Sequence, residues 1–154
     1  MASTTRTIIT HERRGLWARQ LRPRFPSESI RWVETRSTAD LRAALLGRSR
    51  PIVVLDLGDP LRRGLAELAE AREAAPDALI VVVEPRSRPA AVALAPEMGA
   101  TLVLPGVVVP PAMVNLLTRW IALADARSDA DGWSPDREPK PGLIDELIAI
   151  AEAC

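Results

Sequence analysis

Apolar residues gather along the chain in runs that predict five β-strands. Two of these runs, Ile52–Leu55 and Ala78–Val83, are unbroken and rich in β-branched residues. Such runs are typical of strands that are buried on both faces of a parallel sheet. Shorter or alternating runs predict three further strands, at Thr7–Thr10, Ile30–Thr35 and Thr101–Leu104. We therefore expect a five-stranded sheet with Ile52–Leu55 as its central strand.

Segments with apolar residues at helical spacing separate the strands. They predict a helix that contains Leu16, Trp17 and Leu21, a helix capped by Thr38, a helix from Pro60 to about Ala75 capped by Asp59, a short helix that begins at Pro89, and a helix over Ala112–Arg127. Because strands and helices alternate, the fold class that we expect is α/β, a three-layer, doubly wound five-stranded parallel sheet.

The expected domain organisation follows from a change of composition near residue 127. We expect one domain over residues 5–127, a polar, proline-rich linker over residues 128–141, and a C-terminal amphipathic helix over residues 142–154. So short a helix is marginal in water unless its apolar face packs against something, so we expect it to dock, in cis or in trans. The candidate docking side chains are Trp120 in the last domain helix, Trp133 in the linker, and Leu143, Ile144, Leu147 and Ile148 in the tail.

The composition, 47% hydrophobic and 26% charged, supports a packed core, in which we expect Trp17, Trp32 and Trp120 to be packing residues. No apolar run approaches the roughly 18 to 20 residues of a membrane span, and the first residues lack the apolar core of a signal peptide. The only cysteine is Cys154, which leaves no intrachain disulfide framework and no zinc cluster. We therefore expect a cytoplasmic protein without a membrane partner.

The net charge is zero, but the charges are unevenly distributed. Residues 1–50 contain eleven arginines and four acidic residues, so the first third is basic and the remainder is acidic. The arginines of this first third could form a surface that binds nucleic acid or an acidic protein, or they could simply be exposed to solvent, which is the interpretation we favour. An adaptor for nucleic acid is thus an alternative hypothesis. The sequence contains no phosphate-binding glycine motif and no nucleophile elbow.

The stretch Leu55–Pro60, LDLGDP, resembles the phosphoacceptor stretch of bacterial response-regulator receiver domains, with Asp56 at the phosphoacceptor position. Residues 98–105, MGATLVLP, are similar to a second motif of that family, in which a Gly-Ala pair and a strand precede a Lys-Pro pair. The resemblance implies a flavodoxin-like fold with the strand order 2-1-3-4-5. It also implies that the peptide bond before Pro105 can be cis.

Several positions depart from the pattern of that family. The resemblance implies two carboxylates after the first strand, which would hold Mg²⁺, but this corner reads Thr10-His11-Glu12. Val83 replaces the serine or threonine that would contact a phosphoryl group, and Leu104 replaces the lysine that would pair with it. Phosphoryl transfer relies on a metal ion and cations to neutralise the transferring oxygens. We therefore interpret the chain as a degenerate receiver, or pseudoreceiver.

The leading hypothesis is a non-enzymatic signalling or scaffolding module without a cofactor. It would bind a protein partner or a second copy of itself through the last domain helix and the tail. The alternative is a stand-alone atypical receiver that is phosphorylated on Asp56, with Mg²⁺ held by Glu12 and Asp56. Otherwise His11 and Glu12 are interpreted as a solvated loop pair, and Asp56 as an acid that accepts hydrogen bonds from loop amides.

Overall fold

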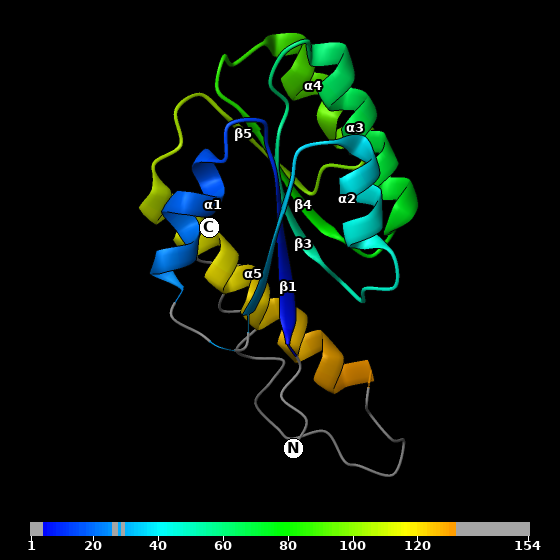
Figure 1. The fold of residues 1–154 in the computed structure, drawn as a ribbon, viewed down its shortest axis with the longest axis vertical. Coiled ribbons are helices and arrows are strands. Elements are labelled where there is room, and N and C mark those ends of the chain that lie inside the picture. The colour runs from blue at the N-terminus through cyan, green and yellow to red at the C-terminus, as the bar shows by residue number, and fades with distance from the viewer. Residues whose placement is uncertain (1–4, 26–27, 29, 132–154) are drawn as a thin grey trace, which may run out of the picture. The chain divides into compact units, whose positions relative to one another are not determined.

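A computed structural model describes residues 5–25, 28 and 30–131 of the protein, with side chains up to residue 126 (Figure 1). The chain divides into two compact units, Met1–Ala124 and Asp125–Cys154, and the sheet belongs to the first. Most of the predicted linker and the whole predicted tail helix lie outside the described residues. The docking predictions for Trp133, Leu143, Ile144, Leu147 and Ile148 fall in that part of the chain and stay predictions.

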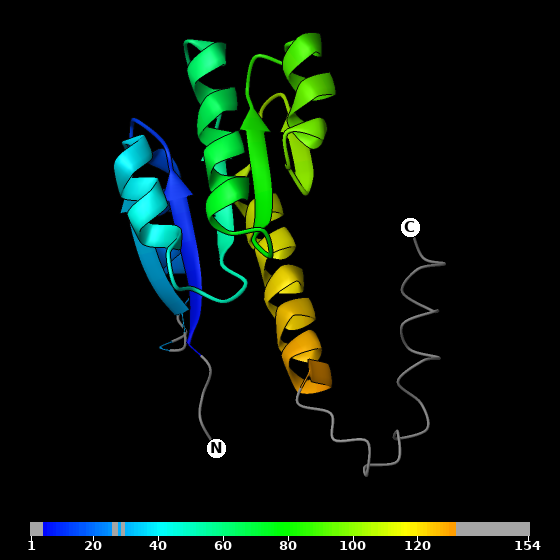
Figure 2. The ribbon, with the colours of Figure 1, turned by 90° about the vertical axis from the view of Figure 1, so that its right-hand side faces the viewer.

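Five parallel strands form one sheet in the order β2-β1-β3-β4-β5, which confirms the predicted fold class and strand order. The strands are β1 (Arg6–His11), β2 (Ile30–Thr35), β3 (Ile52–Asp56), β4 (Leu79–Glu84) and β5 (Leu102–Pro105). β2 has the predicted bounds, and each of the other strands ends one residue later than predicted. Figure 2 shows the strand arrows pointing to the same edge of the sheet.

Six helical segments accompany the sheet in the described residues. They are α1 (Leu16–Leu21), the 3-10 turn η1 (Arg22–Arg24), α2 (Thr38–Leu45), α3 (Leu61–Ala74), α4 (Pro89–Glu97) and α5 (Pro110–Asp131). In Figure 1, α2, α3 and α4 lie on one face of the sheet, and α1 lies on the other with the part of α5 that belongs to the first unit. This is the three-layer arrangement expected when strands alternate with helices.

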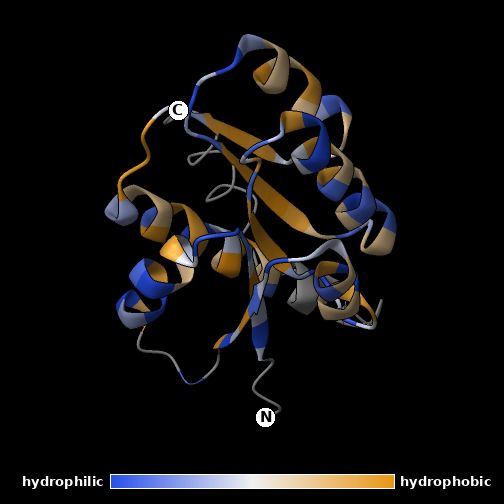
Figure 3. Cartoon of the chain, turned by 45° about the horizontal axis from the view of Figure 1, so that its top comes forward, coloured by the Kyte–Doolittle hydropathy of each residue, from blue (hydrophilic) through white to orange (hydrophobic). Residues whose placement is uncertain are grey.

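The side chains of the central strands alternate between two apolar layers. Ile52 and Val54 of β3 pack in a cluster with residues of α1 and α5, whereas Val53 and Leu55 pack in a cluster with residues of α2, α3 and α4. Successive side chains of a strand point to opposite faces, so an unbroken apolar run fills both layers. Figure 3 shows the resulting band of hydrophobic residues along the central strands.

The three tryptophans expected in the core are packing residues. Trp17 and Trp120 are 6% and 9% exposed, and Trp32 packs on the same cluster with its ring centroid 5.6 Å from that of Phe25. This burial has a consequence for Trp120, which is also predicted to dock a partner. Its side chain is largely used inside the domain, so it offers little surface for a contact with another protein.

Several boundaries differ from the prediction for local reasons. The N-cap of α2 is Ser37 and not Thr38, and its Oγ accepts a hydrogen bond from the amide of Asp40 at 3.1 Å. The N-cap of α3 is Pro60, and the side chain of Asp59 does not cap that helix. α5 continues to Asp131, so the first four residues of the predicted linker are helical.

The cis peptide bond of the described residues is Asp59–Pro60, so the bond before Pro105 is trans, in contrast to the implied possibility. Close packing fixes the loop between β3 and α3. A Cβ atom on Gly64 of α3 would lie 2.1 Å from the carbonyl oxygen of Leu57, a distance that only glycine permits. Among the described helices, none combines the length and the apolar character that a membrane span needs. The predicted cytoplasmic location stays a prediction.

Candidate functional site

The carboxyl ends of the parallel strands and the loops after them surround a pocket. Ligand sites of open α/β sheets are typically found at this edge. The pocket has a volume of about 480 Å³. The pocket is lined by residues from the ends of β3 and β4, from the segments after β1, β3, β4 and β5, and from the start of α1. They are Glu12, Arg13, Arg14, Leu16, Trp17, Asp56, Gly58, Asp59, Val83, Pro85, Arg86, Arg88, Gly106, Val107 and Val108.

Asp56 is the last residue of β3 and lines the pocket half-buried. Its Oδ1 accepts a hydrogen bond from the amide of Gly58 at 2.9 Å. Gly58 has a φ of 54°, a conformation that favours glycine. Burial raises the pKa of Asp56, and the negative charge of Glu84 adds to this, although the Gly58 amide and the charges of Arg14 and Arg13 act in the opposite direction. The interpretation of Asp56 as an acceptor for a loop amide agrees with this geometry.

His11 and Glu12 are adjacent at the end of β1, and successive side chains of a strand point to opposite faces. Glu12 points to α1, where its Oε1 accepts the backbone amides of Trp17 at 2.5 Å and of Ala18 at 3.1 Å. Burial raises the pKa of Glu12 despite these hydrogen bonds. His11 and Glu12 are only 2% and 6% exposed, so the interpretation as a solvated loop pair is wrong.

His11 belongs to a cluster on the opposite face of the sheet, which we call the Glu67 cluster. Nδ1 of His11 lies 2.9 Å from Oγ1 of Thr35, and Nε2 lies 3.1 Å from Oε2 of Glu67 on α3. Arg63 donates a hydrogen bond to Oε1 of Glu67 at 2.9 Å. Burial by itself would raise the pKa of Glu67, but the hydrogen bonds from Arg63 and His11 outweigh it and hold the pKa below its ordinary value. The cluster ties β1, β2 and α3 together.

A further set of contacts joins the loop after β3 to the end of β4, and we call it the Arg88 clasp. Glu84, the last residue of β4, is fully buried, and its two carboxylate oxygens accept hydrogen bonds from Arg88 at 3.1 and 2.6 Å. The same guanidinium donates to the carbonyl oxygen of Gly58 at 2.9 Å and to Oδ1 of Asp59 at 3.0 Å. The hydrogen bonds with Glu84 hold the pKa of Arg88 above its ordinary value, so Arg88 stays a cation.

Four arginines line the pocket, and their charges are neutralised to different degrees. Arg86 and Arg88 both pair with Asp59, at 2.5 and 3.0 Å. Arg13 donates to the main-chain carbonyl oxygen of Asp59, which leaves its charge uncompensated by that contact. Arg14 is exposed, and no carboxylate of the described residues forms an ion pair with it. The pocket therefore has a positive side formed by Arg13 and Arg14.

The strand register brings together three positions that the resemblance singles out. Asp56 lies opposite Val83 on β4, and Val83 lies opposite Leu104 on β5. These are the positions at which the resemblance implies the phosphoacceptor, the hydroxyl group and the lysine. Val83 and Leu104 have no side-chain donor for a phosphoryl oxygen. Val83 and Leu104, which replace the hydroxyl residue and the lysine, are therefore neighbours on adjacent strands, and Val83 is also the neighbour of Asp56.

Comparisons with known proteins agree at the level of the fold. No protein-family model and no curated protein matches the sequence. A response regulator from Burkholderia pseudomallei, with a phosphorylated aspartic acid, a calcium ion and citrate, is 18% identical with a TM-score of 0.57, over 82% of this chain and 74% of that chain. The BeF3-activated DrrB receiver domain is 15% identical with a TM-score of 0.63, over 77% of this chain and 98% of its own. A response regulator from Thermotoga maritima is 13% identical with a TM-score of 0.64, over 77% of this chain and 98% of that chain.

This chain has the receiver fold. The phosphorylated aspartic acid and the BeF3 activation are properties of the proteins in which they were seen. At these identities the likeness concerns the arrangement of strands and helices, so the chemistry at the edge of the sheet has to be judged from the side chains of this chain.

The resemblance to receiver domains implies Mg²⁺ beside the phosphoacceptor, and the described residues fit such a site poorly. Mg²⁺ prefers carboxylate oxygens in an octahedral arrangement. The Oε1 atom of Glu12 is already bound by two amides of α1, and Oδ1 of Asp56 by the amide of Gly58. In the described part of the chain, no group of three or more His, Cys, Asp or Glu residues is placed to hold a metal ion. The cationic side chains that line the pocket are arginines.

The predicted site residues Glu12 and Asp56 do line one pocket, but His11 does not share it. Neither the Arg88 clasp nor the Glu67 cluster was predicted from the sequence. The spacing of Glu84 and Arg88, four residues apart with the acid first, was a signal for the clasp, although the two residues span a loop and not a helix. The contact of His11 with Glu67 joins residues far apart in the chain, and no local pattern indicates it.

Proposed function

We propose that the protein is a signalling module with the receiver fold that acts by binding other proteins and does not transfer a phosphoryl group. The Arg88 clasp is the observation that carries this proposal. In a phosphorylated receiver, the resemblance implies a phosphoryl group on the third strand that is held by side chains of the fourth and fifth strands. Here Arg88 already joins the loop after β3 to Glu84 at the end of β4. The two elements are therefore connected without a phosphoryl group.

The environment of Asp56 also supports this proposal. Attack by a carboxylate on a phosphoryl donor needs cations and donors around the transferring oxygens. Val83 and Leu104 supply none, and Arg86 and Arg88 are engaged with Asp59.

One observation favours a second candidate function, phosphorylation of Asp56. The charges of Arg14 and Arg13 are close enough to Asp56 to lower its pKa, so these side chains could also stabilise added negative charge. This candidate makes the module an atypical receiver that uses arginine in place of a metal ion and a lysine.

Exposed apolar side chains indicate where a protein partner would bind. Val109 is 57% exposed, and Leu102 and Leu123 are 37% and 46% exposed. Leu102 belongs to β5, Val109 to the segment before α5 and Leu123 to α5, and we call these three residues the β5–α5 face. Exposed apolar patches are typical of contact surfaces. The resemblance to receiver domains also carries the expectation of a dimer formed through the fourth and fifth helices. A second copy of the chain is thus the first partner to test.

The absence of phosphoryl transfer is tested with acetyl phosphate. The full-length protein is incubated with acetyl phosphate and Mg²⁺, and its intact mass is measured. We expect the mass to stay unchanged. An increase by one phosphoryl group that is lost in Asp56→Asn would contradict the proposal and support the second candidate.

The contact surface is tested by sedimentation velocity of the full-length protein over a range of concentrations. We expect self-association that is independent of acetyl phosphate and that is weakened by Val109→Asp. Leu46→Asp is the matched control, because Leu46 is 61% exposed and follows α2 on the other side of the sheet. Equal sedimentation of both variants and the wild type would contradict the assignment of the β5–α5 face.

A further inference from the structure

We infer that the pocket at the carboxyl edge of the sheet binds a small organic anion, a molecule with a phosphate or carboxylate head and an apolar body. This inference does not rest on the proposed function, because the pocket can be occupied whether or not Asp56 accepts a phosphoryl group. The pocket volume of about 480 Å³ lies within the range of ligand pockets, about 300 to 1,000 Å³. It leaves room for more than a phosphoryl group.

The head of the ligand would bind on the side of Arg13 and Arg14. Asp59 pairs with Arg86 and Arg88, so those two guanidinium groups are largely neutralised within the protein. Arg13 donates to the carbonyl oxygen of Asp59, and neither Arg13 nor Arg14 forms an ion pair with a carboxylate of the described residues, although both charges act on Asp56 from a longer distance. Guanidinium groups bind phosphate and carboxylate through paired N–H donors, so two of them that form no ion pair within the protein provide a suitable anion site.

The acidic residues of the pocket leave this side open to an anion. Glu12 directs Oε1 to the amides of Trp17 and Ala18 and is 6% exposed. Asp56 is half-buried, and its Oδ1 accepts the amide of Gly58. Both carboxylates are therefore held by the backbone, and neither forms an ion pair with Arg13 or Arg14 in the described structure.

The apolar body of the ligand would bind at the mouth of the pocket. Leu16 and Val107 line the pocket and are 45% and 92% exposed. Val108 continues this wall beside Val107. Covering exposed apolar surface with a ligand removes it from water and contributes about 25 cal/mol per Å². A cationic side next to an exposed apolar wall matches a ligand that carries both an anionic group and an apolar group.

Phenyl phosphate is the probe that tests this inference, because it joins a phosphate head to an aromatic body. Inorganic phosphate and phenol represent the head and the body alone, and benzoate exchanges the phosphate for a carboxylate. Amide NMR titrations of the full-length protein in EDTA give the affinity and the affected residues. We expect shifts at Arg14, Leu16, Asp56 and Val107, and phenyl phosphate to bind at least about tenfold more tightly than phosphate or phenol.

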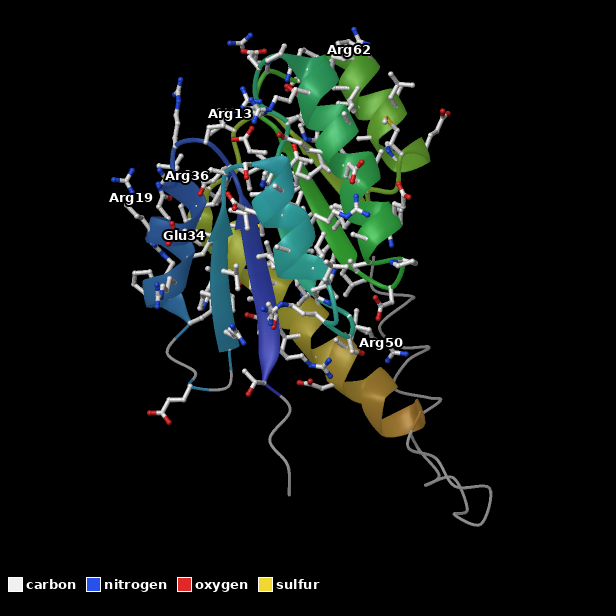
Figure 4. All side chains as sticks on the ribbon, turned by 45° about the vertical axis from the view of Figure 1, so that its right-hand side comes forward. Arg13, Arg19, Glu34, Arg36, Arg50 and Arg62 are labelled. Atoms are coloured by element: carbon white, nitrogen blue, oxygen red, sulfur yellow. The ribbon has the colours of Figure 1, made fainter. Side chains whose placement is uncertain are left out.

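Two variants separate the head from the body. Arg14→Gln is expected to weaken phenyl phosphate about tenfold. Arg62→Gln is the matched control, because Arg62 is an exposed arginine of α3 at the same end of the fold as Arg13 and outside the pocket lining (Figure 4). It should change the affinity by less than about twofold. Val107→Thr should weaken phenyl phosphate about threefold and leave the binding of inorganic phosphate unchanged.

Two results would overturn the inference. One is the absence of shifts at the pocket with millimolar phenyl phosphate and benzoate. The other is an equal loss of affinity in Arg14→Gln and Arg62→Gln, which would indicate general attraction of anions to the basic surface. Tighter binding of phenyl phosphate than of benzoate identifies phosphate as the preferred head, and the reverse order identifies carboxylate. Phenyl phosphate is not an acyl phosphate, so the result is separate from that of the acetyl phosphate experiment.

Discussion

Two groups of charged side chains at the carboxyl edge of the sheet hold their carboxylates in opposite ways. In the Glu67 cluster, the carboxylate of Glu67 accepts hydrogen bonds from Arg63 and pairs with His11, and its pKa lies below the ordinary value. In the pocket, the carboxylate of Asp56 accepts a backbone amide, and burial raises its pKa. The folded protein therefore stabilises the charged form of Glu67, whereas it disfavours the charged form of Asp56.

This difference separates a structural cluster from a site that is open to other molecules. Glu67 is 3% exposed, and both of its oxygens have partners from other parts of the domain. Asp56 opens onto a pocket lined by four arginines, two of which, Arg13 and Arg14, form no ion pair with a carboxylate of the described residues. Buried charges that are fully paired usually serve the fold, whereas uncompensated charges in a cavity point to a ligand. The pocket is thus the part of this edge that can carry function.

The largest expected effect comes from breaking the Arg88 clasp. Arg88→Gln leaves the fully buried carboxylate of Glu84 without its cation, and we expect a loss of about 3 kcal/mol in the free energy of unfolding. Arg86→Gln is the matched control, because its pair with Asp59 lies at the surface and contributes less than about 1 kcal/mol. Urea unfolding at pH 7 measures both values. Equal losses would show that the clasp does not hold the two loops together.

Glu67→Gln tests the structural cluster. It replaces a charged group that accepts hydrogen bonds from Arg63, His11 and Thr38, and we expect a loss of about 2 kcal/mol at pH 7. Glu70→Gln is the control, because Glu70 pairs with Arg42 at 3.5 Å on the exposed surface of the same helix, and the loss there should be below about 1 kcal/mol.

The pH dependence of the Glu67→Gln effect has a defined sign. The pKa of Glu67 in the folded protein lies below its ordinary value of 4.5, so the charge stabilises the folded state. The difference between wild type and variant should be complete above that pH and should decrease as the pH falls through the folded-state pKa. A difference that grows on acidification would contradict the assignment.

The smallest effect has the opposite sign. Asp56→Asn removes a half-buried charge while its side-chain oxygen can still accept the amide of Gly58, so we expect a gain of up to about 1 kcal/mol at pH 7. The pKa of Asp56 is raised above 3.8, so the gain should disappear as the pH falls below that value. Asp59→Asn is the comparison, because it weakens the pairs with Arg86 and Arg88 and should destabilise the protein slightly. A loss of stability in Asp56→Asn would show that its charge serves the fold.

Features that depend on one stretch of the chain could be predicted from the sequence, whereas contacts between separate elements could not. The strands were predictable because unbroken apolar runs such as Ile52–Leu55 must fill two layers at once. The position of Asp56 followed from the end of that run. The Glu67 cluster depends on His11 and Glu67, which lie on different elements, and on the strand alternation that turns His11 and Glu12 to opposite faces. That geometry exists only after the sheet and α3 have packed.

The helix caps show the same limit on a smaller scale. Asp59 before Pro60 is a reasonable sequence signal for a helix cap. In the folded protein its carboxylate pairs with Arg86 and Arg88 from the loop after β4, and α3 begins without a side-chain cap. A tertiary ion pair has replaced a local hydrogen bond, and only the packed structure reveals the exchange.

We propose above all that this domain does not respond to a phosphoryl group at Asp56. Its most direct test is a pair of amide NMR spectra of the full-length protein, recorded without additions and with millimolar Mg²⁺ and beryllofluoride, a mimic of an acyl phosphate. We predict no shifts around Asp56, Val83 and Glu84 that require Mg²⁺. Mg²⁺-dependent shifts at these residues that disappear in Asp56→Asn would contradict the account and would make the protein a phosphorylated receiver.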